Sequence, residues 1–295
     1  MCVTTAIMTR ILRWITLIGL VAVLLFVSGS WIFAQRLTRA RHVAIGPAPA
    51  DFPFPVESVQ FTTADHETLA GWLVPTPTPD KAIILLHGYT GNRKQMLPRA
   101  RFLREQGYSV LLYDARACGE STGERTTIGY RERADLIAAI RFLKDRGCQQ
   151  IACLGVSQGG ATILFAAEDL DGVKCVICES VFDEMTQAVD RRMRRYTGIP
   201  GWLGASLMVP FAERRLELSI DDVRPVDHIG KLACPVLIIS GDRDDRTWPE
   251  DTKRLFAAAR EPKALWMIDG AGHEDLFRLP GYEEKVGKFL NRHLK

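Results

Sequence analysis

One serine of this chain lies where a nucleophile would be exposed. Residues 151–156 are apolar and predict a short buried strand, residues 161–168 predict a helix, and Ser157 stands between them. A serine on so sharp a strand-to-helix turn has a strained backbone that projects its hydroxyl outward. Gly155 and Gly159 remove the side chains that would collide at this turn. The spacing therefore predicts that Ser157 acts as a nucleophile.

The same pattern of glycine and serine occurs a second time, around Ser121. Ser121 follows the predicted strand at residues 108–114 only after several residues, lies among polar turn formers, and has no helix directly after it. Because the chemistry needs the strand and the helix on either side, we interpret Ser121 as a loop residue.

A serine hydroxyl attacks well at neutral pH only when a base removes its proton, and the usual base is a histidine oriented by a carboxylate. His273 is the candidate among the six histidines, because it follows the predicted strand at residues 264–268 on a loop of small residues. His87 ends a strand beside the predicted site, and we expect it to shape its loop rather than to titrate.

The carboxylate should come from a loop that follows a strand and precedes His273. Asp242, Asp244 and Asp245 follow the predicted strand at residues 235–239 and qualify by position. Glu179, at the end of another predicted strand, is an alternative. The residues alone leave this choice open.

A tetrahedral intermediate carries an oxyanion that needs two N–H donors already in place. The backbone N–H of Gln158, one residue after the nucleophile, is the first candidate. The second should come from the loop after the strand at residues 82–86, and we expect it to be the backbone N–H of Tyr89.

The elements that must position these residues alternate along the chain. Apolar or alternating segments predict eight strands, at residues 56–62, 68–74, 82–86, 109–113, 151–156, 173–178, 235–239 and 264–268. Helices are predicted between most of them, including residues 93–106, 131–146, 250–260 and 282–293. Such alternation indicates an α/β fold with a parallel sheet and a ligand site at the carboxyl ends of the strands.

Composition limits the classes of function. With 295 residues and 47% hydrophobic residues, the chain can form one large α/β domain, expected at residues 46–295. A net charge of +3, spread evenly, argues against a nucleic-acid partner. No His/Cys cluster has metal-ligand spacing, so we expect neither a metal nor an organic cofactor.

Residues 1–45 are expected to form a tail, a transmembrane helix at about residues 15–34 and a linker, and the Pro/Ala-rich residues 47–55 are interpreted as the connection from the membrane to the domain. A signal peptide cleaved near residues 28–30 is the rival interpretation, but the apolar run continues past that point, which favours a retained anchor. Arginines on both sides leave the orientation open. Seven cysteines without a disulfide framework favour the cytoplasmic side.

Several motifs together resemble those of the α/β-hydrolase fold serine hydrolases, and in particular the membrane-anchored bacterial members similar to monoacylglycerol lipases and oligopeptidase catalytic domains. The matching segments are residues 87–91, 114–121, 155–160, 235–241 and 271–273. The resemblance implies a mostly parallel eight-stranded sheet with helices on both faces. It also selects Asp244, three residues after Gly241, as the acid. Ala117 departs from the pattern, which usually has glycine there.

The resemblance also implies that residues 181–232 form a helical cap that sets substrate choice. Arginines at positions 191–195 and apolar residues at 202–211 stand out in this insertion. They form either an ordinary solvated helix face or a surface that lies against an anionic membrane.

The expected function is hydrolysis of carboxylic esters, with small-molecule or lipid-like substrates, through an acyl-enzyme at Ser157. A serine peptidase acting on short peptides would use the same residues. A hydrolase-fold protein that binds a ligand without turnover is the third possibility.

Overall fold

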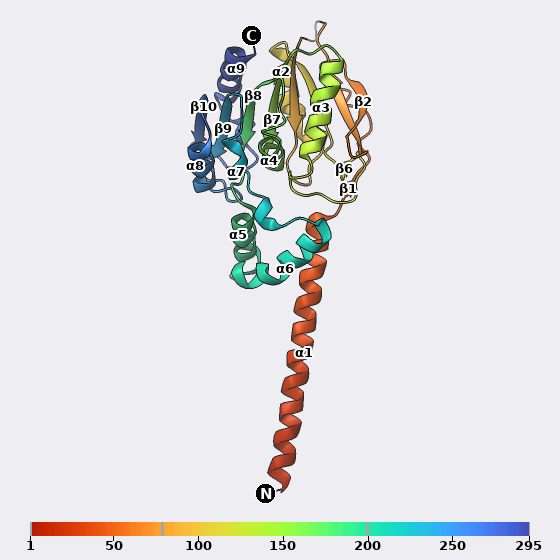
Figure 1. The fold of residues 1–295 in the computed structure, drawn as a ribbon, viewed down its shortest axis with the longest axis vertical. Helices are drawn as coiled ribbons and strands as arrows, with labels where there is room; N and C mark the ends of the chain where they lie inside the picture. Colours follow the sequence, from red (N-terminus) through yellow and green to blue (C-terminus); the bar gives the residue numbers. More distant parts are fainter. Residues whose placement is uncertain (1, 78–79, 199–200, 295) are drawn as a thin grey trace. The chain divides into compact units, whose positions relative to one another are not determined.

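The computed structural model describes residues 2–77, 80–198 and 201–294. The chain divides into two compact units. One comprises Met1–Thr38 and Val189–Ile220, and the other comprises Arg39–Ala188 and Asp221–Lys295 (Figure 1). We refer to them as the N-terminal helical unit and the sheet unit.

The sheet unit is built on eight strands in the order β10-β9-β8-β7-β4-β5-β3-β2. Strand β3 runs antiparallel to its neighbours β2 and β5, and all other neighbours pair in parallel. The strands are β2 (Glu57–Thr62), β3 (Thr68–Val74), β4 (Lys81–Leu86), β5 (Ser109–Tyr113), β7 (Gln150–Val156), β8 (Val173–Glu179), β9 (Val236–Gly241) and β10 (Lys263–Ile268). This confirms the predicted mostly parallel eight-stranded sheet.

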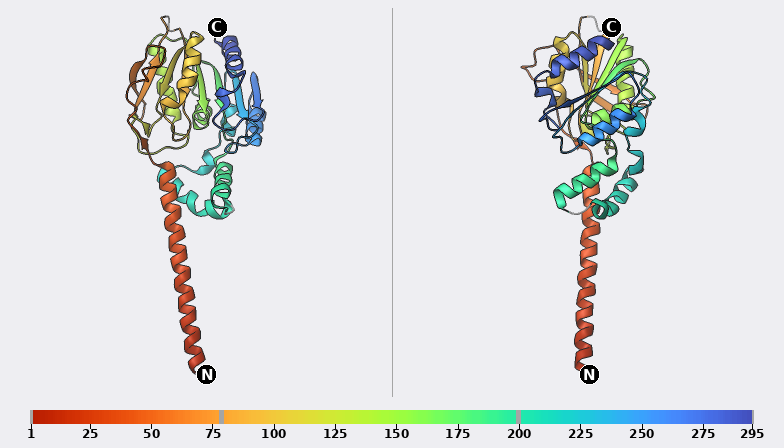
Figure 2. Two further views of the ribbon diagram at one scale, coloured as in Figure 1. Left: turned by 180° about the vertical axis from the view of Figure 1, so that it is seen from behind. Right: turned by 90° about the vertical axis from the view of Figure 1, so that its left-hand side faces the viewer.

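Helices cover both faces of the sheet, as the two ribbon views show (Figures 1 and 2). One face carries α2 (Leu97–Glu105) and α9 (Tyr282–His293), and the other carries α3 (Arg133–Asp145), α4 (Gln158–Phe165) and α8 (Pro249–Ala258). Helix α3 buries Leu136, Ile140 and Leu143, which recur at the spacing of one helix face. The six inner strands, from β9 to β3, are almost wholly buried between the layers, so their ends are held rigidly.

The chain between Arg39 and β2 is attached to the sheet unit. Strand β1 (Arg41–His42) pairs in parallel with β6 (Cys118–Gly119). Ile45 belongs to the main core, and Phe52 and Phe54 pack against it. The segment expected to be a linker is therefore packed on the domain. Its high proline and alanine content suggested a linker, but Phe52 and Phe54 provide the apolar surface that packs against the core.

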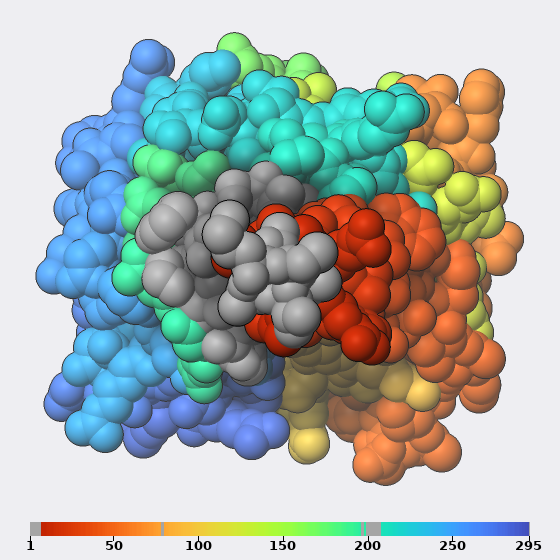
Figure 3. All heavy atoms as spheres, turned by 90° about the horizontal axis from the view of Figure 1, so that it is seen from below, coloured from red at the N-terminus to blue at the C-terminus, as the bar shows by residue number. Residues whose placement is uncertain are grey.

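The N-terminal helical unit contains α1 (Cys2–Thr38), in which the most apolar window of 18 residues within Ile7–Thr38 has a mean hydropathy of 2.4. By length and composition this helix could cross a membrane. Helix α6 (Gly201–Leu216) packs against α1, and Arg215 Nε donates to Thr38 Oγ1 at 2.9 Å. Figure 3 looks along α1 from its N-terminal side.

The predicted cap insertion consists of helical elements. They are α5 (Met185–Thr197), α6, the 3-10 turn η2 (Ile220–Asp222) and α7 (Val226–Ile229). Residues 199–200 lie outside the described residues, and so do the side chains of 201–207, which include the predicted apolar Trp202, Leu203 and Leu207.

Candidate active site

Ser157 lies on the turn between β7 and α4, with a backbone φ of 53° and ψ of −111°. Residues other than glycine adopt this backbone conformation only with strain. A Cβ at Gly155 would lie 2.3 Å from the Gly159 carbonyl carbon, and a Cβ at Gly159 would lie 2.3 Å from the Leu86 oxygen. The Ser157 N–H donates to the Glu179 carbonyl at 2.7 Å. The hydrogen bond to β8 therefore holds the serine in this conformation, and Gly155 and Gly159 leave room for it because they have no side chains.

Asp244 and His273 are in direct contact, although 28 residues separate them in sequence. His273 Nδ1 lies 2.8 Å from Asp244 Oδ2 and 3.0 Å from Oδ1. Since a carboxylate only accepts, the ring proton on this side is on Nδ1, which leaves Nε2 with its lone pair. The side chains are nearly buried, with 7% exposure for His273 and 0% for Asp244. The pair has the geometry of a base held in one tautomer.

Donors from its own loop fix the Asp244 carboxylate. Oδ1 accepts from the backbone N–H groups of Arg246 and Thr247, both at 2.9 Å, and Oδ2 accepts from Thr247 Oγ1 at 2.6 Å. Burial alone would raise the pKa of Asp244, but the hydrogen bond and charge of His273 and the Thr247 donors outweigh burial and lower it. The carboxylate is thus ionised and oriented at neutral pH.

The loops that carry Asp244 and His273 are joined through their backbones. Arg243 N–H donates to the Ala271 carbonyl at 3.0 Å. A Cβ at Gly241 would lie 2.1 Å from that same carbonyl oxygen. The last residue of β9 must therefore be glycine for the loop after β10 to come close enough for the contact.

The other candidate acids are engaged elsewhere. Asp242 is exposed and accepts the Gly270 N–H at 2.7 Å, and Asp245 is also exposed. Glu179 is buried, pairs with Arg99, and accepts a hydrogen bond from the Tyr282 hydroxyl. Its carboxylate binds the helices on the far face of the sheet, so Glu179 is a structural residue.

The loop after β4 is held by His87, as the sequence predicted, and by Gln95, which the sequence did not single out. His87 Nε2 accepts the Ala115 N–H at 3.0 Å, so Nδ1 carries the proton and donates to the Gly88 carbonyl at 2.8 Å. Burial lowers the pKa of His87, which keeps the ring neutral. Gln95 Oε1 accepts the Gly88 N–H at 2.8 Å. The backbone that leads to Tyr89 is fixed on both sides.

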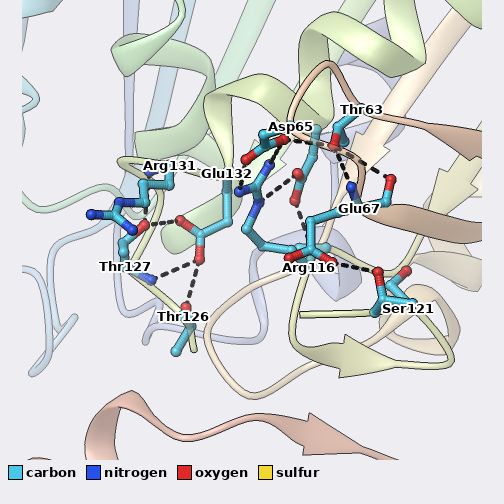
Figure 4. Close-up of polar contacts among 12 residues, drawn as sticks. Thr63, Asp65, Glu67, Arg116, Ser121, Thr126, Thr127, Arg131 and Glu132 are labelled. Carbon is cyan, nitrogen blue, oxygen red and sulfur yellow. Dashed lines mark hydrogen bonds and ion pairs between the residues drawn. The ribbon is translucent and has the colours of Figure 1, made fainter. Parts of the chain in front are cut away.

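A buried carboxylate behind α4 was not anticipated. Glu132 is 0% exposed and accepts from Thr126 Oγ1 at 2.7 Å, from the Thr127 N–H at 2.9 Å and from the Gly129 N–H at 3.0 Å (Figure 4). Thr126 Oγ1 in turn accepts from Gln158 Nε2 at 3.3 Å. Glu132 therefore shapes a loop that contacts the first residue of α4. No local pattern marks this, because these partners lie three to six residues before Glu132 in an irregular loop.

Ser121 has a structural role. Its hydroxyl donates to the Asp114 carbonyl at 2.6 Å and accepts the Ala70 N–H at 3.0 Å, and the residue is 1% exposed. Figure 4 shows it beside Arg116, at the base of the turn after β5. A hydroxyl that joins two strands in this way is not available as a nucleophile.

The strand order places the candidate residues on one edge of the sheet. Ser157 follows β7, Asp244 follows β9 and His273 follows β10, and these strands run parallel. The structure joins Asp244 to His273. Within the described part of the chain, the Ser157 hydroxyl makes no hydrogen bond, so its contact with His273 stays a prediction. Among the described residues, no three His, Cys, Asp or Glu side chains are grouped so that they could hold a metal ion.

Comparisons with known proteins agree with this fold. The profile of the alpha/beta hydrolase family matches residues 83–283. The protein YfhR of Escherichia coli strain K12 is 29% identical over 233 residues, which cover 76% of this chain and 76% of YfhR. YqkD of Bacillus subtilis strain 168 is 30% identical over 225 residues, covering 74% of this chain and 73% of YqkD.

Among solved structures, the esterase Pf2001 of Pyrococcus furiosus superposes with a TM-score of 0.75 at 27% sequence identity. The match covers 88% of this chain and 99% of the esterase. The chain therefore shares the fold of this solved esterase over most of its length.

Proposed function

The chain belongs to the alpha/beta hydrolase family, and from this premise we propose that it is a membrane-anchored serine hydrolase that cleaves carboxylic esters. The observation that carries the proposal is the buried contact between Asp244 and His273, on the same sheet edge as the strained turn at Ser157. A histidine held in one tautomer, on the same sheet edge as a half-buried serine on a strained turn, supports the proposal, because such a base can make a hydroxyl nucleophilic.

The reaction would proceed in two stages. Ser157 Oγ attacks the ester carbonyl while His273 Nε2 takes its proton, and the same proton then passes to the leaving alcohol. Asp244 stabilises the positive charge that His273 carries between these steps. The backbone N–H groups of Gln158 and Tyr89 would hold the oxyanion. Water, activated by His273, hydrolyses the acyl-enzyme and restores the free serine.

Esters are the preferred substrate class, and the similar Pyrococcus furiosus protein described as an esterase supports that choice. A peptidase acting on short peptides would need the same residues and a site that also protonates a leaving amine. A protein that binds a ligand without turnover would have no need for the four donors on Asp244.

The anchor is supported by the continuity of α1. The helix runs from Cys2 to Thr38 without a break at residues 28–30, and its apolar run continues past them to Ala34. A signal peptide would end its apolar run before the cleavage point, so this continuation favours the interpretation that α1 is retained.

The test compares the full-length chain with Ser157→Ala on an ester and an amide of the same acyl group. We expect ester turnover in the wild type and a loss of at least about 10³-fold in Ser157→Ala. A higher kcat/KM on the amide would favour the peptidase. Absence of turnover on both, in a folded wild type, would favour the binding protein.

A further inference from the structure

Charge is unevenly divided between the two units, which corrects the even spread expected from the sequence, because the units join segments that are far apart along the chain. Residues 1–38 and 189–220 contain nine arginines, no lysine and three acidic residues, which gives this unit a net charge of +6. The whole chain carries only +3, so the sheet unit carries −3. A nearly neutral protein thus concentrates its positive charge in the unit that also contains its most apolar helix.

Two of these arginines, Arg36 and Arg215, lie at the C-terminal end of α1. The apolar run of α1 ends at Ala34, and Thr38 follows four residues later, about 6 Å further along the helix axis. If residues 15–34 span the hydrocarbon core, Thr38 lies in the headgroup layer, which is about 5–8 Å thick. Arg215 bonds to Thr38, and Arg36 is on the same turn of α1. Both are therefore at the depth of lipid phosphates.

The two cap helices of this unit have the composition of interfacial elements. Residues 201–212 of α6 contain no charged residue, and twelve such residues are too few to span a bilayer but suit its interface. Helix α5 contributes Arg191, Arg192, Arg194 and Arg195. Arg194 is 61% exposed while pairing with Asp190 at 2.8 Å.

We propose that α5 and α6 form a lipid-binding surface that lies on the anionic face of the bilayer from which α1 emerges. The inference rests on the proposed membrane anchoring. The α6 helix contacts α1 directly, so insertion of α1 brings α6 to the interface. Each arginine near an anionic surface strengthens the attraction by about fivefold. Nucleic acid would suit the charge but not the twelve uncharged residues at the start of α6.

The test uses the full-length chain in vesicles of phosphatidylcholine alone or with phosphatidylglycerol added, followed by hydrogen exchange of peptides from residues 185–195 and 208–216. We expect anionic lipid to slow exchange in these peptides at least about fivefold, the contribution of one arginine at the surface. High salt should remove the protection. Exchange that is equal in both vesicles would overturn the proposal.

The variant Arg191→Gln/Arg192→Gln/Arg194→Gln/Arg195→Gln should lose the protection by anionic lipid. A matched control removes four positive charges from the sheet unit, with the substitutions Arg101→Gln, Lys144→Gln, Lys231→Gln and Lys288→Gln, and it should keep the protection. Thermal unfolding of each variant verifies its fold. Equal protection by anionic lipid in the two variants would contradict a specific surface. If a variant does not fold, the comparison of lipids and salt concentrations in the wild type decides the question.

Flotation of the same vesicles separates this proposal from the one on which it rests. A wild-type chain that does not float with vesicles contradicts the anchor, and the surface with it. A chain that floats without lipid-dependent protection contradicts the surface alone. Neither readout depends on ester hydrolysis.

Discussion

At the residue scale, the contact between Asp244 and His273 is what distinguishes this site from a sheet edge with a polar loop. Three aspartates follow β9 within four residues, yet only Asp244 is buried, and it alone faces the imidazole. Its neighbours in sequence have solvent-exposed side chains.

We expect Asp244→Asn to reduce kcat about 10³–10⁴-fold, because the amide N–H₂ would no longer accept from His273 Nδ1 and the wrong tautomer would be stabilised. Asp242→Asn is the matched control and should retain kcat within about threefold, because its carboxylate only accepts the Gly270 N–H at the surface. Steady-state kinetics on one ester checks both variants. Equal losses in the two variants would contradict the assignment of the acid.

Asp65 provides a stability prediction with a defined pH window. Hydrogen bonds from Arg116 outweigh burial and lower the pKa of Asp65 to about 2, below an unfolded value of about 3.9. Its contribution is therefore present above pH 4 and is lost as pH falls from about 4 to 2. We expect Asp65→Asn to be less stable than wild type in urea at pH 5 and to approach it near pH 2. A difference in the free energy of unfolding that is the same at pH 5 and pH 2 would contradict this.

At the element scale, the turn between β7 and α4 depends on backbone packing that only glycine permits. We expect Gly159→Ala to lower the free energy of unfolding by about 1–3 kcal/mol or more, because the new Cβ would lie 2.3 Å from the Leu86 oxygen. The matched substitution is Gly287→Ala in α9, where the new Cβ would have its nearest neighbour, Gln106 Oε1, at 3.9 Å. It should raise the free energy of unfolding by about 0.5–1 kcal/mol, because alanine has the higher helix propensity. Denaturant titration of both variants checks this. A tolerated Gly159→Ala would show that the turn can move aside.

The elements with strong patterns were predictable from the sequence. The strand at residues 82–86 is observed as Lys81–Leu86, and the helix at 282–293 is observed as Tyr282–His293. Continuous apolar runs and helical periodicity are local signals, and the structure changes their ends by one or two residues. The helix expected at 93–106 is divided into a 3-10 turn and α2, because Asn92 caps the turn and Pro98 begins the helix anew.

What the sequence could not show were contacts between distant residues. Glu132 and Thr126 meet only after the loop before α3 closes, and Glu179 is excluded as the acid only by its pairing with Arg99 and Tyr282. Ala117 adopts a φ of 61°, so this turn uses the conformation usual for glycine without a glycine. These features depend on tertiary packing, which no local pattern encodes.

At the scale of the whole molecule, α1 continues as one helix through residues 28–30, where a signal peptide would be cut. We expect the intact mass of the chain, purified from membranes, to include residues before position 28, because the apolar run continues past residues 28–30 to Ala34 and the helix is long enough to span a membrane. Mass spectrometry of the undigested protein checks this. A chain that begins at residue 31 would contradict the anchor.

The central claim is that Ser157 is the nucleophile, and a fluorophosphonate tests it most directly. The full-length chain in detergent is treated with the reagent, digested and mapped by mass spectrometry, with Ser157→Ala as the folded control. We predict one adduct, on the peptide that contains Ser157, no adduct on Ser121, and none on the variant. A wild type that takes no label, or an adduct on another serine, would contradict the assignment of Ser157.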